Sequence, residues 1–401
     1  MNHLSVKQHP YSLMTALLSW SGMVVMCSLY VTIPLIDLFA DLFQVSATRA
    51  AAAGSIFSLG FAAGCLVYGA LSDRYGRKQV ILTGMIALTL ISLILGLVHN
   101  FAGLLVLRAL QGAAAATFSP VALAYAVEMF PAERRVSTIG FISTGFLVAG
   151  IAGQLISSLL SQTYGWNAVF LLLSTIYALT AILTWLLLPK GEIHHSHAGI
   201  WEPIKHIGKV FAKKRLLLCY LVAFVLLMSF VGMYTMLGAY VSRAPFELKP
   251  GQILLVRAFG VLGMILSPFA GKLAKRLGTR AVLRSGLLMA IVGMAALGLI
   301  SNLPLLVVMT IVFVAGIAIA VPSLVSLVGS LSGNLRGIAV SMYTFILFAG
   351  TSIGPVLALQ FIRAGSFAVS FALFALVLGI GLIAALLLDR ETDESPQPAN
   401  K

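Results

Sequence analysis

The segment that decides the fold joins two long apolar runs and reads Gly69-Ala70-Leu71-Ser72-Asp73-Arg74-Tyr75-Gly76-Arg77-Lys78-Gln79. A second version of it starts 202 positions later and reads Gly271-Lys272-Leu273-Ala274-Lys275-Arg276-Leu277-Gly278-Thr279-Arg280-Ala281. Four positions hold the same residue in both copies, namely Gly69, Leu71, Arg74 and Gly76 and then Gly271, Leu273, Arg276 and Gly278. A chain of 401 residues that repeats itself at half its length indicates a duplicated unit. In an apolar chain, such a duplication favours a transporter built from two halves.

The composition places this duplicated unit in a membrane. The chain is 60% hydrophobic and 9% charged, with a mean hydropathy of +1.03, which is too apolar for a water-soluble core of this length. Twelve apolar stretches are long enough to cross about 30 Å of hydrocarbon, and they cover 13–36, 48–70, 79–98, 102–126, 136–160, 167–188, 215–238, 251–271, 281–300, 304–327, 336–360 and 366–388. Because the stretches do not alternate polar and apolar residues, they indicate helices rather than barrel strands. We predict an all-α polytopic membrane protein with two pseudo-symmetric six-helix bundles.

The polar stretches divide the chain into four parts. We predict an N-terminal six-helix bundle over 1–188, a linker over 189–214, a C-terminal six-helix bundle over 215–388 and a polar tail over 389–401. In the linker, apolar residues from Ile200 to Phe211 share one side of a helical wheel and Lys residues share the other. This pattern predicts a basic amphipathic helix on the inner membrane surface.

Lys and Arg fall mainly in every second loop, which fixes the orientation. The loop that holds Arg74, Arg77 and Lys78 lies inside the cell if the amino terminus is cytoplasmic, and so does the linker. We therefore expect a multi-pass protein of the cytoplasmic (inner) membrane with both termini in the cytoplasm. Contact with anionic lipid accounts for the net charge of +14, so no nucleic-acid partner is expected.

The loop between the second and third spans carries the clearest chemistry. Gly69 and Gly76 allow close helix approach and a tight turn. Asp73 is suited to an interaction with a helix amino terminus, and Arg77 is placed to reach Glu128 at the end of the fourth span. For Lys78, plain positive charge on the inner side remains an equal alternative.

This loop resembles the signature G-x-L-x-D-R-x-G-R-K of the Major Facilitator Superfamily, matched at Gly69, Leu71, Asp73, Arg74, Gly76, Arg77 and Lys78. The stretch from Arg108 to Gly112 resembles the R-x-x-Q-G motif of the twelve-helix drug:proton antiporter branch of that family. The resemblance implies alternating access by rocking of two bundles, with the loop Asp and Arg holding the halves together on the cytoplasmic side. The second copy has Lys275 in place of Asp73, so the ionic chemistry is expected in the first half only.

Arg108 lies inside its span, where a charge is costly and therefore indicates function. The resemblance implies a cavity residue involved in proton coupling, with Gln111 one helical turn away; snorkelling to the outer surface is the alternative. No carboxylate falls in the middle of a predicted span. Asp37 is the nearest acid and our candidate coupling partner of Arg108, while an ordinary loop carboxylate is the alternative that we favour for it.

Two further sets of residues complete the predicted site. Met and aromatic side chains are candidates for an apolar substrate cavity, at Met23, Met26, Tyr30, Tyr234, Met236, Tyr343 and Phe348. Small residues and a proline in the fifth and eleventh spans predict close helix packing, at Gly145, Gly150, Gly153, Gly350, Gly354 and Pro355. Pro120 and Pro322, paired by the repeat, are expected to bend the fourth and tenth spans.

These features predict a secondary active transporter that exports small amphipathic compounds, such as drugs, in exchange for protons. The alternative is a facilitator or symporter that imports a sugar, an organic anion or another metabolite. No enzyme motif, metal site or cofactor site is recognised in the sequence, and the proton gradient is the expected driving force. We expect a monomer whose partners are a small-molecule substrate, protons and membrane lipid.

Overall fold

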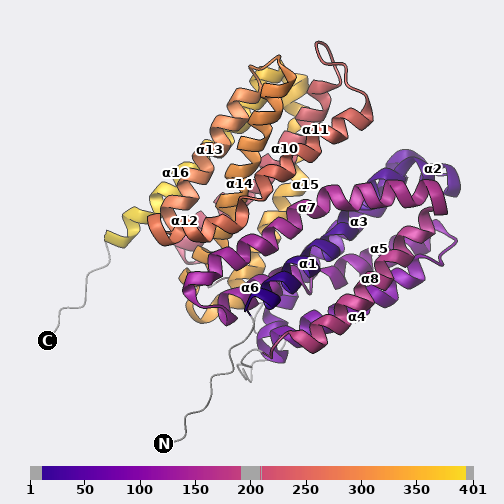
Figure 1. The fold of residues 1–401 in the computed structure, drawn as a ribbon, viewed down its shortest axis with the longest axis horizontal. Helices are drawn as coiled ribbons and strands as arrows, with labels where there is room; N and C mark the ends of the chain where they lie inside the picture. The colour runs from indigo at the N-terminus through magenta and orange to yellow at the C-terminus, as the bar shows by residue number, and fades with distance from the viewer. Residues whose placement is uncertain (1–10, 191–207, 209, 394–401) are drawn as a thin grey trace, which may run out of the picture.

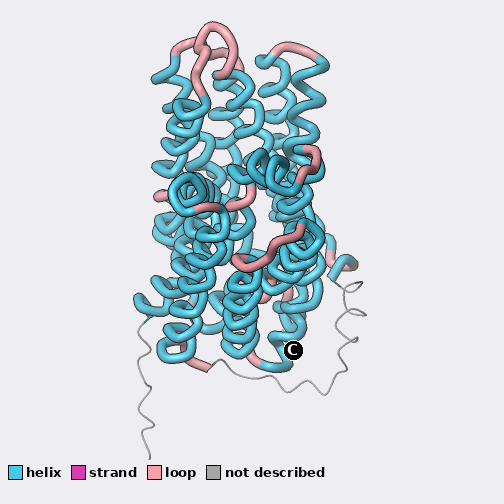
Figure 2. Tube along the Cα trace, turned by 90° about the vertical axis from the view of Figure 1, so that its right-hand side faces the viewer, coloured by secondary structure: helices cyan, strands magenta, loops and turns pink. Residues whose placement is uncertain are grey.

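The computed structural model describes residues 11–190, 208 and 210–393, and its ordered elements are helices. Figure 2 shows helices and short loops but no strand in this described part of the chain. Twelve of these helical segments are long and apolar enough to cross a membrane. The predicted fold class and the predicted number of spans are therefore confirmed.

The first half supplies six spans. The first span is interrupted near its far end, where the 3₁₀ turn η1 (Ile33–Leu35) contains Pro34. The fourth span is also interrupted, between α5 and α6. The α-helices of this half are α1 (Tyr11–Tyr30), α2 (Ile36–Phe43), α3 (Ala47–Tyr75), α4 (Arg77–Leu95), α5 (Phe101–Ala115), α6 (Ser119–Met129), α7 (Ala132–Tyr164) and α8 (Trp166–Leu187).

The second half repeats this order of spans. Short 3₁₀ turns, η2 (Ser267–Phe269) and η3 (Gly333–Leu335), precede α12 and α15. The α-helices of this half are α10 (Lys214–Val241), α11 (Pro250–Met264), α12 (Ala270–Leu277), α13 (Thr279–Leu297), α14 (Leu303–Leu331), α15 (Arg336–Ala364) and α16 (Phe367–Asp393). Several of these helices extend beyond the predicted spans, because helical hydrogen bonding continues past the apolar stretch that hydropathy detects.

The duplication is visible in which helices pack together. In the first half α1 lies along α7, and in the second half α10 lies along α15. Glycines permit both approaches: a Cβ added to Gly153 would lie 2.9 Å from the carbonyl oxygen of Cys27, and a Cβ added to Gly350 would lie 2.5 Å from that of Phe224. These contacts are too short for a side chain, so the backbones of each pair meet directly.

The two paired prolines have different effects. Pro120 lies at the start of α6, and the helix before it is broken at 116–118, where 3₁₀-type hydrogen bonds join Thr117 to Ala114 and Phe118 to Ala115 at 3.1 Å each. Pro322 lies inside α14, which is continuous over Leu303–Leu331. The interruption before Pro120 therefore has no counterpart at Pro322, because neighbouring turns of α14 accommodate the proline without ending the helix. The bend of the tenth span stays a prediction.

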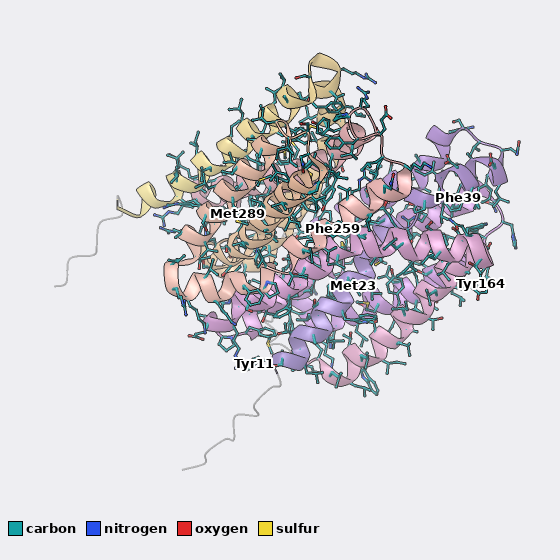
Figure 3. All side chains as sticks on the ribbon, turned by 45° about the horizontal axis from the view of Figure 1, so that its top comes forward. Tyr11, Met23, Phe39, Tyr164, Phe259 and Met289 are labelled. Atoms are coloured by element: carbon teal, nitrogen blue, oxygen red, sulfur yellow. The ribbon has the colours of Figure 1, made fainter. Side chains whose placement is uncertain are left out.

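The two halves meet at one end of the molecule and diverge toward the other (Figure 1). The described chain begins at Tyr11 and ends at Asp393 near the end of the molecule at which Figure 1 labels α6 and α12, and we call this the terminal end. Figure 3 places Tyr11 at this end and places Phe39 and Tyr164 at the opposite end, which we call the distal end. Most of the predicted linker helix lies outside the described residues.

The division of loops between the two ends predicts which loops reagents can reach. His99 is exposed in the distal loop before α5, and Gln79 is exposed at the terminal end in the first turn of α4. In a chain whose three buried cysteines are replaced by alanine, a membrane-impermeant maleimide added to intact cells should label His99→Cys and not Gln79→Cys. Gln79→Cys should react only after lysis. Labelling of Gln79→Cys in intact cells would place the terminal end outside.

Candidate functional site

Arg77 is the centre of a charged cluster at the terminal end. Gly76, with a φ of 92°, ends α3 and starts α4, a conformation that favours glycine. This turn directs Arg77 back into the bundle, where its side chain is 3% exposed. It forms ion pairs with Asp73 and with Glu128, the latter at 3.0 Å, and it donates to the Gly69 carbonyl at 3.1 Å. Because Glu128 is on α6, this cluster fastens α3, α4 and α6 together.

The same loop also touches the other half of the protein. A Cβ added to Gly337, in the first turn of α15, would overlap the carboxylate of Asp73, so this carboxylate lies against the start of that helix. The positive end of the helix dipole favours a negative charge in this position. Gly69 packs against Ser341 of α15 with no room for a side chain. The sequence predicted the ion pair to Glu128 and the interaction of Asp73 with a helix start, and it did not identify α15 as the partner.

The second copy of the loop makes the equivalent contact with the first half, but without the charges. Gly278, with a φ of 85°, turns the chain as Gly76 does, and Gly271 packs against Ser137 at the start of α7. Ser137 donates to the carbonyl of Pro268 at 2.9 Å. Lys275 stands exposed in the position that corresponds to Asp73. The first copy of the loop therefore supplies a charged contact between the halves, and the second copy supplies an uncharged one.

Two residues of the signature have other roles in the structure. Lys78 donates to the carbonyl of Trp185 at 2.7 Å, near the carboxyl end of α8 in its own half, where a cation is favoured. Its place in a gate between the halves is therefore not supported. Arg74 is exposed, and its guanidinium carbon lies 5.5 Å from the centre of the Tyr75 ring.

Arg108 is buried completely inside the first half. Its Nη1 donates to Gln111 at 2.5 Å and its Nε donates to the Ala53 carbonyl at 3.1 Å, while its guanidinium carbon lies 4.4 Å from the centre of the Phe57 ring. Gln111 in turn donates to Ser92 at 2.8 Å. The Nη2 atom has no hydrogen-bond partner in the described chain. These contacts place Arg108 in the interior, and the snorkelling alternative does not apply.

Asp37 and Arg108 form no ion pair in this structure, so their coupling stays a prediction. Asp37 is exposed in the first turn of α2, where a carboxylate is stabilised by the helix dipole. Arg77 forms ion pairs with Asp73 and Glu128, and neither involves Asp37. The sequence could not show this, because α2 begins after the break at η1 and turns Asp37 outward.

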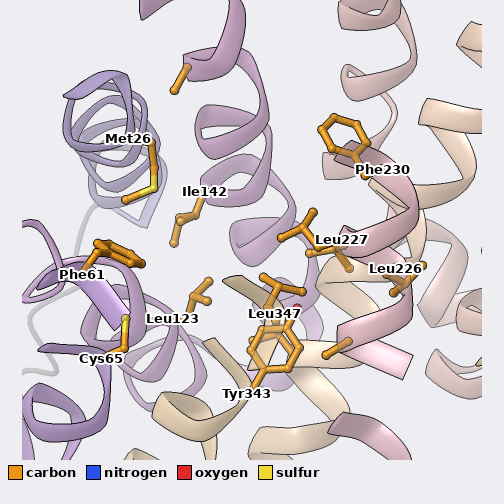
Figure 4. Close-up of a cluster of buried hydrophobic side chains, with 14 of the residues drawn as sticks. Met26, Phe61, Cys65, Leu123, Ile142, Leu226, Leu227, Phe230, Tyr343 and Leu347 are labelled. Carbon is orange, nitrogen blue, oxygen red and sulfur yellow. The ribbon is translucent and has the colours of Figure 1, made fainter. Parts of the chain in front are cut away.

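Three of the predicted cavity residues, Met26, Tyr343 and Phe348, lie where the halves face each other. Figure 4 shows Met26 of α1, Phe61 of α3 and Leu123 of α6 on one side, opposite Leu227 and Phe230 of α10, with Tyr343 and Leu347 of α15 below. Tyr343 is fully buried, and its hydroxyl has no partner among the described residues. Phe348 packs edge-to-face against Phe61, with ring centres 4.7 Å apart.

The remaining predicted residues separate into two groups. Met23 and Tyr30 lie three residues before and four residues after Met26, on the same side of α1. Met236 is fully buried, and it lies two residues from Tyr234, which places it on nearly the opposite side of α10. The place of Met236 in the same cavity as Tyr234 therefore stays a prediction.

The predicted packing glycines lie at the helix pairs already described. A Cβ on Gly145 would lie 3.2 Å from the backbone nitrogen of Met23, and Gly354 lies against the backbone of Met228. Gly150 is different, because an added Cβ would meet only the Tyr30 ring at 3.6 Å, an ordinary contact. Pro355 is half-buried within α15 and does not break it.

Arg257 is a charged residue of the interior for which the sequence predicted no role. Arg257 lies in α11 with its side chain partly buried, and its Nη2 donates to the carbonyl of Tyr234 at 3.1 Å. Its position seven residues after Pro250 matches that of Arg108 seven residues after Phe101. The pattern that could have revealed it is this shared distance from the start of a span.

The described residues contain no group of three or more His, Cys, Asp or Glu side chains that could hold a metal ion. The histidines at 194–197 lie outside the described part. Charge in the interior of the described spans is therefore carried by guanidinium groups.

Comparison with known proteins agrees with this architecture. A family model described as Major Facilitator Superfamily matches residues 18–256 and 246–401. The chain belongs to this superfamily. Its members are transporters and not enzymes, which confirms the prediction that the chain has no catalytic site.

Its relatives include an uncharacterized transporter of Buchnera aphidicola (strain Sg), 23% identical over 88% of this chain and 87% of the relative. The multidrug resistance protein MdtG of Enterobacter lignolyticus is 26% identical over 59% of this chain and 58% of its own. Among solved structures, the fucose:proton symporter FucP of E. coli is similar in fold, with a TM-score of 0.74, 17% identity and coverage of 93% of this chain and 98% of that chain.

The contacts of Asp73 and Glu128 predict how firmly the terminal end is closed. Replacing either carboxylate, as Asp73→Asn or Glu128→Gln, removes one charged partner of buried Arg77, at a cost of about 1.5–3 kcal/mol. Ser341, 1% exposed, reports this closure. In a Ser341→Cys background without native cysteines, either variant in nanodiscs should react with maleimide roughly tenfold faster.

Lys275→Gln is the matched control, because it changes one charge at the corresponding position of the second copy. It should leave the rate of the Ser341→Cys reaction unchanged. Equal rates in all four proteins would show that the charged cluster does not hold the halves closed.

Proposed function

We propose that this protein is a proton-coupled exporter of small amphipathic compounds that works by alternating access. The terminal end faces the cytoplasm in this proposal, as the distribution of Lys and Arg predicts. Contacts between the halves include those of Ser137 with Pro268, of Thr144 with Met264 and of Phe61 with Phe348. The conformation is then one that is closed to the cytoplasm.

The observation that carries the proposal is the fully buried guanidinium of Arg108, which has no carboxylate partner in the described chain. A charge inside a membrane protein is costly and is expected to serve transport. Arg108 and Gln111 match the motif of the drug:proton antiporter branch. The relationship to MdtG, a multidrug resistance protein by name, supports the same substrate class.

Proton coupling requires a group that binds the proton, and the described spans offer carboxylates mainly at the cytoplasmic cluster. A proton on Asp73 or Glu128 would remove an attraction to Arg77 and favour opening toward the cytoplasm. The proton would then leave on the cytoplasmic side as the substrate enters from it. This order of events is the one required for export that is driven by the inward flow of protons.

Import by a facilitator or symporter is the second candidate. The absence of a carboxylate beside Arg108 among the described residues favours it, because a facilitator needs no proton carrier. The two candidates differ in the direction of substrate accumulation and in its dependence on the proton gradient.

Everted membrane vesicles test the proposal directly. A compound would first be chosen from a panel of growth inhibitors by the resistance that the protein confers on cells lacking their own exporters. Added to respiring vesicles, it should bring protons out and raise the internal pH, which acridine orange reports. Arg108→Gln should reduce this signal at least tenfold, because the buried charge is lost.

Arg49→Gln removes an exposed guanidinium from α3 in the same half and should retain the signal. Transport that continues unchanged in the presence of an uncoupler would sink the exporter proposal and favour a facilitator. Wild-type transport by Arg108→Gln would remove Arg108 from the mechanism.

A further inference from the structure

The second half contains its own interior guanidinium at the depth of Arg108. Both Arg257 and Arg108 lie seven residues into a helix that starts at the distal end, which is about 10 Å along the axis. The two residues differ in accessibility: Arg108 is sealed inside its bundle, whereas Arg257 is only partly buried. Arg257 can therefore meet a ligand where Arg108 cannot.

Arg257 is held by a reciprocal pair of contacts with α10. Its Nη2 donates to the carbonyl of Tyr234 at 3.1 Å, and the Tyr234 hydroxyl donates to the carbonyl of Arg257 at 3.4 Å. Gly238 provides the space for the guanidinium and Gly260 provides the space for the tyrosine hydroxyl, since a Cβ at either position would overlap them. The guanidinium is thus positioned and not simply trailing from the helix.

This guanidinium has unused hydrogen-bonding capacity. A guanidinium carries five N–H donors, and the Nε of Arg257 is buried without a partner among the described residues. No carboxylate of the described chain lies within ion-pair distance of it. A partly desolvated cation without a counter-ion is destabilised, and an anion that enters the site would relieve this cost.

The surface next to Arg257 is apolar. Leu227, Phe230 and Tyr234 are spaced by three and four residues and so share one side of α10. The rings of Phe230 and Tyr234 lie 5.1 Å apart. Figure 4 shows Leu227 and Phe230 directed toward Met26 and Ile142 of the first half. A cation at the distal end of this side is therefore continuous with an apolar surface at the centre of the molecule.

We propose that Arg257 and Tyr234 form a binding site for the anionic head of an amphipathic monoanion, whose apolar part lies along Phe230 and Leu227. A carboxylate that reaches the partly exposed guanidinium of Arg257 can accept charge-assisted hydrogen bonds from it, which are strong and directional. This inference rests on the proposed transport of amphipathic compounds and narrows the substrates to anions. It assigns substrate recognition to the second half and leaves the ionic gate in the first.

The test uses three probes that have similar straight alkyl chains and heads of different charge: octanoate, octanamide and octyltrimethylammonium. Binding to the purified full chain in nanodiscs would be measured by calorimetry at fixed ionic strength. The wild type should bind octanoate at least tenfold more tightly than octanamide, and octyltrimethylammonium least tightly. Arg257→Gln should reduce the ratio of the two dissociation constants to near one, and Gly238→Ala should reduce it by displacing the guanidinium without changing the charge.

Arg363→Gln is the matched control, because Arg363 is exposed near the distal end of α15 and supplies the same charge to the surroundings. It should preserve the preference for octanoate. Octanamide binding and the melting temperature show that each variant is folded. If Arg363→Gln and Arg257→Gln lost the preference for octanoate equally, the preference would come from the net positive charge and not from a site at Arg257, which would overturn the proposal. An unchanged preference in Arg257→Gln would overturn it as well. Proton-coupled export that persists alongside either result would leave the proposed function standing.

Discussion

The ion pairs of Arg77 are the interaction on which the arrangement of this protein depends. A guanidinium that is 3% exposed is costly to bury, and Asp73 and Glu128 offset that cost from α3 and α6. The turn at Gly76 makes this possible, because the chain must reverse within one residue for Arg77 to point back. The same turn brings Asp73 to the start of α15. One loop thus fixes helices within the first half and sets its contact with the second.

The two halves have kept their shape and divided their chemistry. Gly69 and Gly271 make equivalent close contacts with the opposite half, at α15 and α7. Only the first of these contacts is charged, since Lys275 stands where Asp73 would be. The interior cations differ as well, because Arg108 is enclosed by its own bundle and Arg257 lies partly open on α11. Close packing against the opposite half requires glycine in both copies of the loop, whereas only the first copy has the carboxylate of Asp73.

The span count, the helical class and the membership of the superfamily could be predicted from the sequence, because hydropathy and the loop motif depend on local order. The pairing of Arg77 with Glu128 could also be proposed, since both residues lie at ends of predicted spans. Contacts that depend on helix rotation could not. Asp37 turns outward after η1, and Met236 faces away from Tyr234 on α10. The partner of Asp73 was hidden because nothing local to the loop identifies α15.

The fourth span is interrupted and the tenth span is not, and this difference has a mechanical consequence. The interruption at 116–118 leaves α5 and α6 as two short rods joined by a loosened turn, while α14 remains a single rod of 29 residues. Bending stress applied to both halves would concentrate at the weaker joint. The second half would then move as a rigid body, and the first half would deform next to α5, the helix that holds Arg108.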